Sequence, residues 1–216
     1  MLRYNFQNEL TELHTRLLFM GGRIEEMLNL SLHALRTGDL AAADEVLRIE
    51  EEIDRLAEEV DARSVELIAK QQPVGQDLRR LIGSMRMAID MERVADINVN
   101  IVEQANLLPR PLIKPLVDLP RMIDVSASMF QDALDALINS NCELAYLVLR
   151  RDDVVDDLCE DIVVELREIM GKDSSKVPGA LPLLIAAIQI ERIADHATNI
   201  AESVIYICTG KRVKAE

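Results

Sequence analysis

Acidic side chains recur in two matching segments whose spacing could bind a cation. Residues 92–103 read ERVADINVNIVE, and residues 191–202 read ERIADHATNIAE. Four acidic or amide positions recur 99 residues apart: Glu92, Asp96, Asn100 and Glu103 match Glu191, Asp195, Asn199 and Glu202. Residues four apart lie on one face of a helix, where like charges repel each other. A chain that keeps this repulsion at two matching places is expected to bind a cation there.

Two further acidic pairs, again four residues apart, precede these segments. They are Glu50 with Asp54 in EEEID, and Asp152 with Asp156 in DDVVD. If each pair faces the next one along the chain, four carboxylates converge in each half. Such a cluster has raised pKa values or holds a metal, and an oxygen-only site suits Fe³⁺, Mn²⁺, Mg²⁺ or Ca²⁺, with Zn²⁺ possible. The predicted metal ligands are Glu50, Asp54, Glu92, Asp96, Asp152, Asp156, Glu191 and Asp195.

An ordinary explanation of these pairs stays open. The chain is 29% charged, so acidic pairs four residues apart arise by chance on solvated helix faces, and a duplication copies them. The recurrence of four pairs at equivalent places favours a metal. Glu92 and Asp96 also continue a helical stripe of apolar residues, which predicts that they lie in line with the core; the stripe is Leu78, Ile82, Met85 and Ile89.

Composition predicts a soluble helical protein with cationic or basic partners. Of the 216 residues, 49% are hydrophobic but only 3% are aromatic, which is typical of long helices rather than sheets. The formal net charge is −14, which argues against nucleic acid and against anionic lipid as partners. It favours cations and basic protein surfaces.

The cysteines and the apolar segments predict a cytoplasmic location. Cys142, Cys159 and Cys208 lack CxxC spacing and are predicted to be small buried side chains in a reducing compartment. The first residues lack the apolar core of a signal peptide. The longest apolar stretch, around 181–190, is expected to be too short to cross a membrane.

Periodicity and punctuation predict an all-α fold of two tandem, repeat-related three-helix bundles. The expected helices span about residues 5–37, 40–70, 75–107, 118–140, 142–170 and 179–209. Asp39 and Asn141 stand where N-caps are needed, and the proline-rich segment 108–120 is the expected connection between the halves. The predicted repeats are residues 1–108 and 109–216.

No catalytic constellation is found in the sequence. It has no glycine-rich phosphate loop, and no serine or cysteine stands in a recognisable nucleophile–base pattern. His196 follows Asp195 directly, but Ile97 replaces it in the first half, so it is predicted to face solvent or a partner. A ferritin-like di-iron protein would need ExxH pairs, which this chain lacks. No enzymatic activity is expected.

Three segments together resemble the PhoU family of phosphate-signalling regulators. They are QQPVGQDLRR at 71–80 and the acidic segments at 92–103 and 191–202. The resemblance covers nearly the whole chain and implies iron, zinc or another divalent ion such as Mg or Mn at the acidic pairs. The family often has glycine directly before the second acidic residue of its last-helix motif, whereas this chain has Ala95 and Ala194 before Asp96 and Asp195. Both residues are small, so a neighbouring helix or a ligand should still be able to approach closely.

The resemblance implies a regulator rather than an enzyme. PhoU-like proteins repress the phosphate-starvation response by contact with the ATPase subunit of the phosphate ABC transporter and with a sensor histidine kinase. A homodimer without nucleic acid or membrane insertion is expected. Two alternatives remain open: a ferritin-like or other carboxylate-bridged metalloenzyme, and a metal-free helical adaptor whose acidic faces dock a basic partner.

Overall fold

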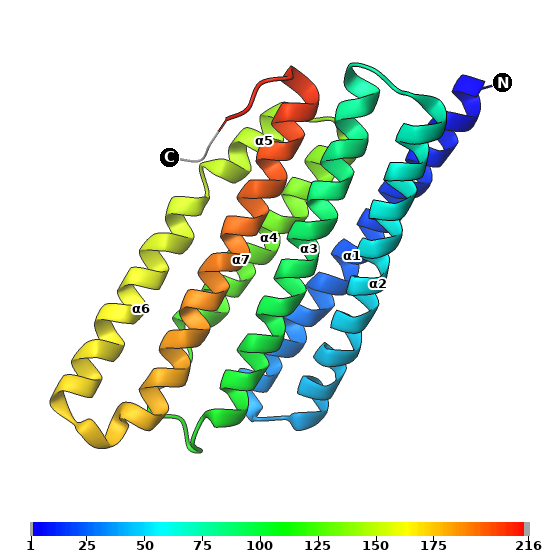
Figure 1. Ribbon diagram of the computed structural model, residues 1–216. Coiled ribbons are helices and arrows are strands. Elements are labelled where there is room, and N and C mark those ends of the chain that lie inside the picture. The colour runs from blue at the N-terminus through cyan, green and yellow to red at the C-terminus, as the bar shows by residue number, and fades with distance from the viewer. Residues whose placement is uncertain (1, 214–216) are drawn as a thin grey trace.

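The computed structural model describes residues 2–213 and is all-α (Figure 1). Within that range it has no strand, as the composition predicted. The helices are α1 (Leu2–Thr37), α2 (Leu40–Gln71), α3 (Gln76–Leu107), α4 (Asp118–Asn139), α5 (Cys142–Leu149), α6 (Asp152–Lys172), the short 3₁₀ helix η1 (Ser174–Lys176) and α7 (Val177–Thr209).

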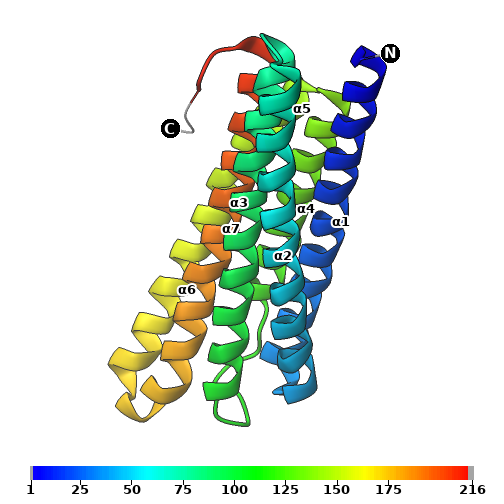
Figure 2. The ribbon, with the colours of Figure 1, turned by 45° about the vertical axis from the view of Figure 1, so that its right-hand side comes forward.

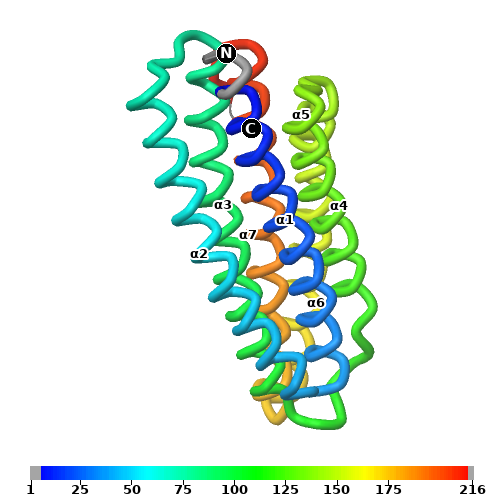
Figure 3. The backbone as a smooth tube through the Cα atoms, turned by 90° about the vertical axis from the view of Figure 1, so that its right-hand side faces the viewer, coloured from blue at the N-terminus to red at the C-terminus, as the bar shows by residue number. Residues whose placement is uncertain are grey.

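The long helices run side by side, with the two halves of the chain packed against each other (Figures 1 and 2). Helix α2 packs on α3, α3 on α7, and α7 on α6, so these four form one layer. Helices α1 and α4 contact each other and pack behind that layer, which the side view shows (Figure 3). The α3–α7 contact therefore joins the two repeats at the centre of the layer.

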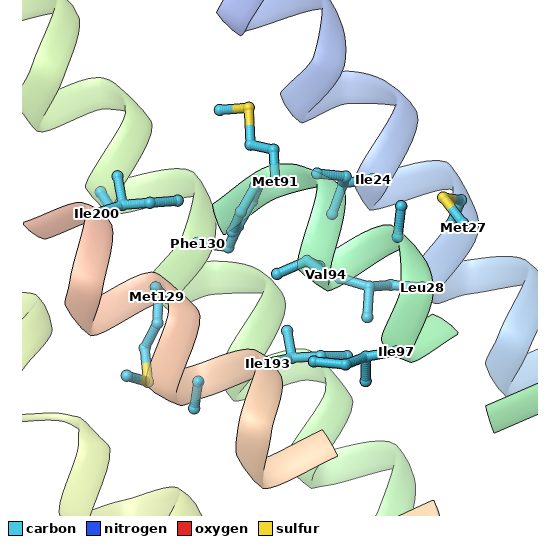
Figure 4. Close-up of a cluster of buried hydrophobic side chains, with 14 of the residues drawn as sticks. Ile24, Met27, Leu28, Met91, Val94, Ile97, Met129, Phe130, Ile193 and Ile200 are labelled. Atoms are coloured by element: carbon cyan, nitrogen blue, oxygen red, sulfur yellow. The ribbon is translucent and has the colours of Figure 1, made fainter. Parts of the chain in front are cut away.

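One apolar core serves both repeats (Figure 4). Met91 and Val94 of α3 lie among Ile24 of α1, Phe130 of α4 and Ile193 of α7, and all are at most 2% exposed. The two halves therefore bury these side chains together. The predicted boundary between residues 108 and 109 divides the sequence repeats and does not imply that each repeat folds alone.

The predicted helix boundaries and caps are largely confirmed. The Asp39 carboxylate accepts from the Ala41 backbone N–H at 2.9 Å, and the Asn141 side chain accepts from that of Leu144 at 3.1 Å. Each side-chain oxygen pairs a backbone donor that the first helical turn leaves unsatisfied. The chain between α3 and α4 is non-helical, as the prolines predicted.

The fifth predicted helix is not continuous, which corrects the expectation of one helix over 142–170. It breaks at Arg150 and Arg151 between α5 and α6. There the hydrogen bonding changes to the tighter 3₁₀ pattern, because the Arg151 N–H donates to the Val148 carbonyl, three residues earlier, at 3.0 Å. The Arg151 guanidinium is held outside the helix by Asp132 and by Ser128, the latter at 3.0 Å. Asp152 then begins a new helix, where a negative charge is favourable.

Two expectations about apolar residues are also corrected. The segment Ser174–Thr209 is long and apolar enough to cross a membrane, with mean hydropathy 1.4. Half of its most apolar window is buried inside the protein, and a core helix of a soluble protein passes the same test. Cys159 is buried as predicted, but Cys142 and Cys208 are only half-buried. The Cys208 thiol lies 3.5 Å from the Ser140 carbonyl.

Candidate metal centre

Helices α2 and α3 bring together the first two acidic pairs, which we name the α2–α3 site: Glu50, Asp54, Glu92 and Asp96. All four side chains are half-buried. Burial, followed by the facing Asp96, raises the pKa of Asp54. Burial and then Asp54 raise the pKa of Glu92, and nearby Arg93 partly offsets this. The pKa of Glu50 is raised by burial and by its carboxylate neighbours. The predicted pairs therefore face each other.

Helices α6 and α7 do the same for the second set, the α6–α7 site: Asp152, Asp156, Glu191 and Asp195. Burial first, and then Asp156 and Asp195, raises the pKa of Asp152 to about 6. The pKa values of Asp156 and Glu191 are raised by burial and by facing carboxylates, and that of Asp195 by burial against the opposing effect of His196. Asp156 and Asp195 are nevertheless exposed as whole residues, so this site is more open on one side.

The donor set fits a hard cation. One carboxylate oxygen in each site, Asp54 Oδ1 and Asp152 Oδ1, is buried without a hydrogen-bond partner. Such an atom gains from a bound cation or water. In the α2–α3 site Arg93 contacts Asp96 at 3.1 Å, and the Arg93 side chain is 57% exposed. Among residues 2–213, no three Asp, Glu, His or Cys side chains are gathered closely enough to hold a metal as they stand.

The acidic pairs lie beside the core rather than in line with it, which corrects the stripe argument. Ile89 is 54% exposed, and Leu78, Ile82 and Met85 are only half-buried. The buried stripe of α3 runs one position away, through residues such as Leu81 and Met91. Half-exposure leaves the carboxylates within reach of ions from solvent. Ala95 and Ala194 are fully buried, so both small residues face the packed interior.

His196 is largely shielded from solvent, contrary to the prediction that it faces solvent or a partner. It is half-buried, and its Nδ1 lies 2.9 Å from Asp90 Oδ1. Asn199 Nδ2 also approaches that oxygen, at 3.4 Å. This contact joins α3 to α7 between the repeats. A signal was present in the sequence: Asp90 and His196 both differ from their repeat counterparts, Gln189 and Ile97.

Cys159 lies beside the α6–α7 site, a placement that the sequence reasoning missed. Burial first, and then Glu191 and Asp156, raises the pKa of its thiol to about 11. Ala57 occupies the equivalent position of α2, so the α2–α3 site has no such neighbour. Asn100 of the repeated pattern does not join the carboxylates either, because its side chain donates to the Asp96 backbone carbonyl at 2.9 Å.

Comparison with known proteins identifies the family. The family model described as the PhoU domain matches residues 17–105 and again 119–204. The chain belongs to the PhoU family. The two matched segments fall in the two halves of the bundle, which confirms the predicted tandem repeat of a three-helix unit.

Similar proteins cover nearly the whole chain. A phosphate-specific transport system accessory protein PhoU homolog of Clostridium acetobutylicum is 36% identical over 99% of this chain and 98% of its own length. The accessory protein PhoU of Escherichia coli is 30% identical over 95% of this chain and 86% of its own. The crystal structure of PhoU from Pseudomonas aeruginosa matches with a TM-score of 0.91 at 32% identity, over 95% of this chain and all of the other.

Proposed function

We propose that this protein is an accessory protein of a phosphate transport system that regulates phosphate uptake and signalling, and that it binds metal ions at the α2–α3 and α6–α7 sites. The role is supported by relatives of similar length that are named phosphate-specific transport system accessory proteins, and by a similar solved structure named as a regulatory protein of the phosphate transport system. The observation that carries the metal assignment is the facing of carboxylate pairs in both halves, with a buried oxygen left unpartnered in each.

A metal ion would be held by the carboxylates of both helices of a site. Its positive charge offsets their mutual repulsion and gives the buried oxygens a partner. Because each site draws ligands from two helices, an ion stabilises α2 against α3, and α6 against α7. Iron, zinc, manganese and magnesium all accept carboxylate ligands. The proposed role of the metal is to hold a helix surface in one arrangement, and no catalytic residue is assigned.

The proposed partners are proteins of the transport and signalling system: the ATPase subunit of the phosphate ABC transporter and a sensor histidine kinase. Contact with them in the cytoplasm would repress the phosphate-starvation response, with the protein acting as a homodimer. The net charge of −14 supports encounter with basic protein surfaces, because complementary charge raises association rates. Added salt should therefore slow association more than it speeds dissociation.

The test is a variant in which Glu92, Asp96, Glu191 and Asp195 are all changed to Ala. We expect the folded variant to lose its metal by elemental analysis and to fail to repress phosphate-starvation genes in a deletion strain. The matched control changes Glu12, Asp61, Glu160 and Asp161 to Ala, which removes the same number of charges from exposed positions outside both sites and outside the repeated acidic pattern. Full repression by a folded, metal-free site variant would contradict the proposal and favour the metal-free adaptor.

A further inference from the structure

A polar pocket lies away from both acidic sites, near the beginning of α3 and the end of α7. Its volume is about 160 Å³. Figure 1 shows the end of α7 and the following residues, in red, beside the N-terminal part of α3. The pocket is lined by one residue of α3, three of α7 and two beyond it: Arg86, Glu202, Ser203, Tyr206, Arg212 and Val213.

The pocket concentrates positive charge in an acidic protein. The chain has 38 acidic and 24 basic residues. Seven arginines of residues 2–213 pair with a carboxylate, and neither Arg86 nor Arg212 is among them. The Arg86 guanidinium instead lies 5.9 Å from the centroid of the Tyr206 ring. Contact with the ring orients that group while leaving its N–H donors available. Within residues 2–213 neither guanidinium donates a hydrogen bond, so two groups with available donors border one small pocket.

We propose that this pocket binds a small oxyanion of the phosphate type, held by Arg86 and Arg212. A planar guanidinium donates two parallel N–H groups to a pair of anion oxygens, so two arginines can hold a tetrahedral oxyanion from two sides. Ser203 and Tyr206 add hydroxyl groups to the lining. A volume of about 160 Å³ admits such an ion together with water.

Glu202 gives the pocket a preference among oxyanions. Its carboxylate leaves the lining with one net positive charge and can accept a hydrogen bond in addition to the contact that it already makes. Inorganic phosphate carries a proton near neutral pH and can donate that bond. Sulfate has no proton and would place a lone pair against the carboxylate. The ligand class is therefore a protonated oxyanion, for which free phosphate is the probe.

The arginine–tyrosine pair of this pocket is not repeated at the equivalent positions of the other half of the chain. The positions equivalent to Arg86 and Tyr206 hold Ile185 and Leu107, so duplication alone does not account for it. Phosphate binding in this pocket requires neither metal at the acidic sites nor the proposed regulation. If free phosphate is the ligand, this pocket would supply a signal to the proposed regulator.

The experiment is calorimetric titration of the chelator-treated full chain with inorganic phosphate at pH 7 and low salt. Removing metal excludes phosphate held through a metal ion and separates this test from that of the acidic sites. We expect saturable binding that weakens by about tenfold or more in Arg86→Gln and in Arg212→Gln, because each loses a charged hydrogen-bond donor. The matched control is Arg167→Gln, an exposed arginine of α6 without an ion pair among residues 2–213, which should bind normally.

Two outcomes would overturn the proposal: no binding at millimolar phosphate, or equal binding by wild type and both arginine variants. Arg212 lies beyond α7, so its variant tests the pocket even if Arg86→Gln disturbs the helix packing. Sulfate and glycerol phosphate serve as further probes. We expect free phosphate to bind tighter than either, and Glu202→Gln to abolish the preference over sulfate. Equal binding of sulfate and phosphate by wild type would overturn the role given to Glu202.

Discussion

The α2–α3 site stands on two unbroken helices, whereas the α6–α7 site begins at a helix break. Glu50 lies within α2, ten residues after its first residue, but its repeat counterpart Asp152 is the first residue of α6. All four carboxylates of the first site are half-buried, while Asp156 and Asp195 of the second are exposed. Cys159 stands beside the second site where the first has Ala57. Duplication has preserved the facing pairs while their surroundings diverged.

The cores of the two repeats differ in the same way. In the first, the Ser31 hydroxyl donates to Asn98 Oδ1 at 3.0 Å between α1 and α3, and both residues are fully buried. In the second, the equivalent positions are Ala133 and Ala197, also fully buried. One geometry thus accepts a polar pair or two methyl groups. The polar pair favours one position of α1 relative to α3, because a shift that broke the hydrogen bond would leave buried polar groups without a partner, which is costly.

The largest expected effect is the stabilisation of the folded protein by bound metal, to which each site should contribute its own part. Metal at about 100 times its dissociation constant should add about 2.7 kcal/mol for each occupied site if it binds only the folded state. Protons compete for carboxylates with raised pKa values, so the gain in melting temperature should be larger at pH 7 than at pH 5. Calorimetric melts of chelated and metal-loaded protein measure this gain.

Pairwise variants assign that gain to the two sites. Changing Glu92 and Asp96 to Ala should remove only the α2–α3 part, and changing Glu191 and Asp195 to Ala only the α6–α7 part. A metal-induced shift of equal size at both pH values, or one unchanged in both double variants, would show that the ion is held elsewhere.

The helices and the acidic pairs along each helix could be predicted because they depend on local rules. Helical periodicity, the N-caps at Asp39 and Asn141 and the spacing of four residues are all set within a few residues of chain. The break at Arg151 was missed because it depends on Asp132 and Ser128 of another helix. Which arginines form a pocket likewise depends on how two distant segments pack.

An intermediate effect is expected from breaking the buried polar pair of the first repeat. Ser31→Ala leaves Asn98 Oδ1 buried without that partner, which should cost about 1–3 kcal/mol of unfolding free energy in denaturant titration. Ser64→Ala is the matched control, because the Ser64 hydroxyl is equally buried but has no hydrogen-bond partner. That control should be neutral or slightly stabilising. Equal losses in the two variants would mean that the Ser31–Asn98 bond adds nothing.

The smallest expected effect is a titration that tells the two sites apart. In metal-free protein, the Asp152 carboxyl should titrate with a pKa of about 6 in side-chain carbon NMR spectra. The N-terminus of α6 favours its charged form, so burial and the neighbouring carboxylates must outweigh that field. Asp156→Asn should lower this pKa, because one repelling charge disappears, whereas Asp161→Asn, at an exposed position on the same helix, should leave it unchanged.

The sign of the linked stability follows from this raised pKa. The folded state holds the Asp152 proton more tightly than the unfolded chain, whose aspartates titrate near 3.8. The stabilisation from that proton is complete below about pH 4 and is lost as pH rises through about 6. Metal-free protein should therefore lose stability across this window, and Asp156→Asn should reduce the loss. An Asp152 titration near 4, with no change in Asp156→Asn, would mean that the α6–α7 carboxylates do not act on one another.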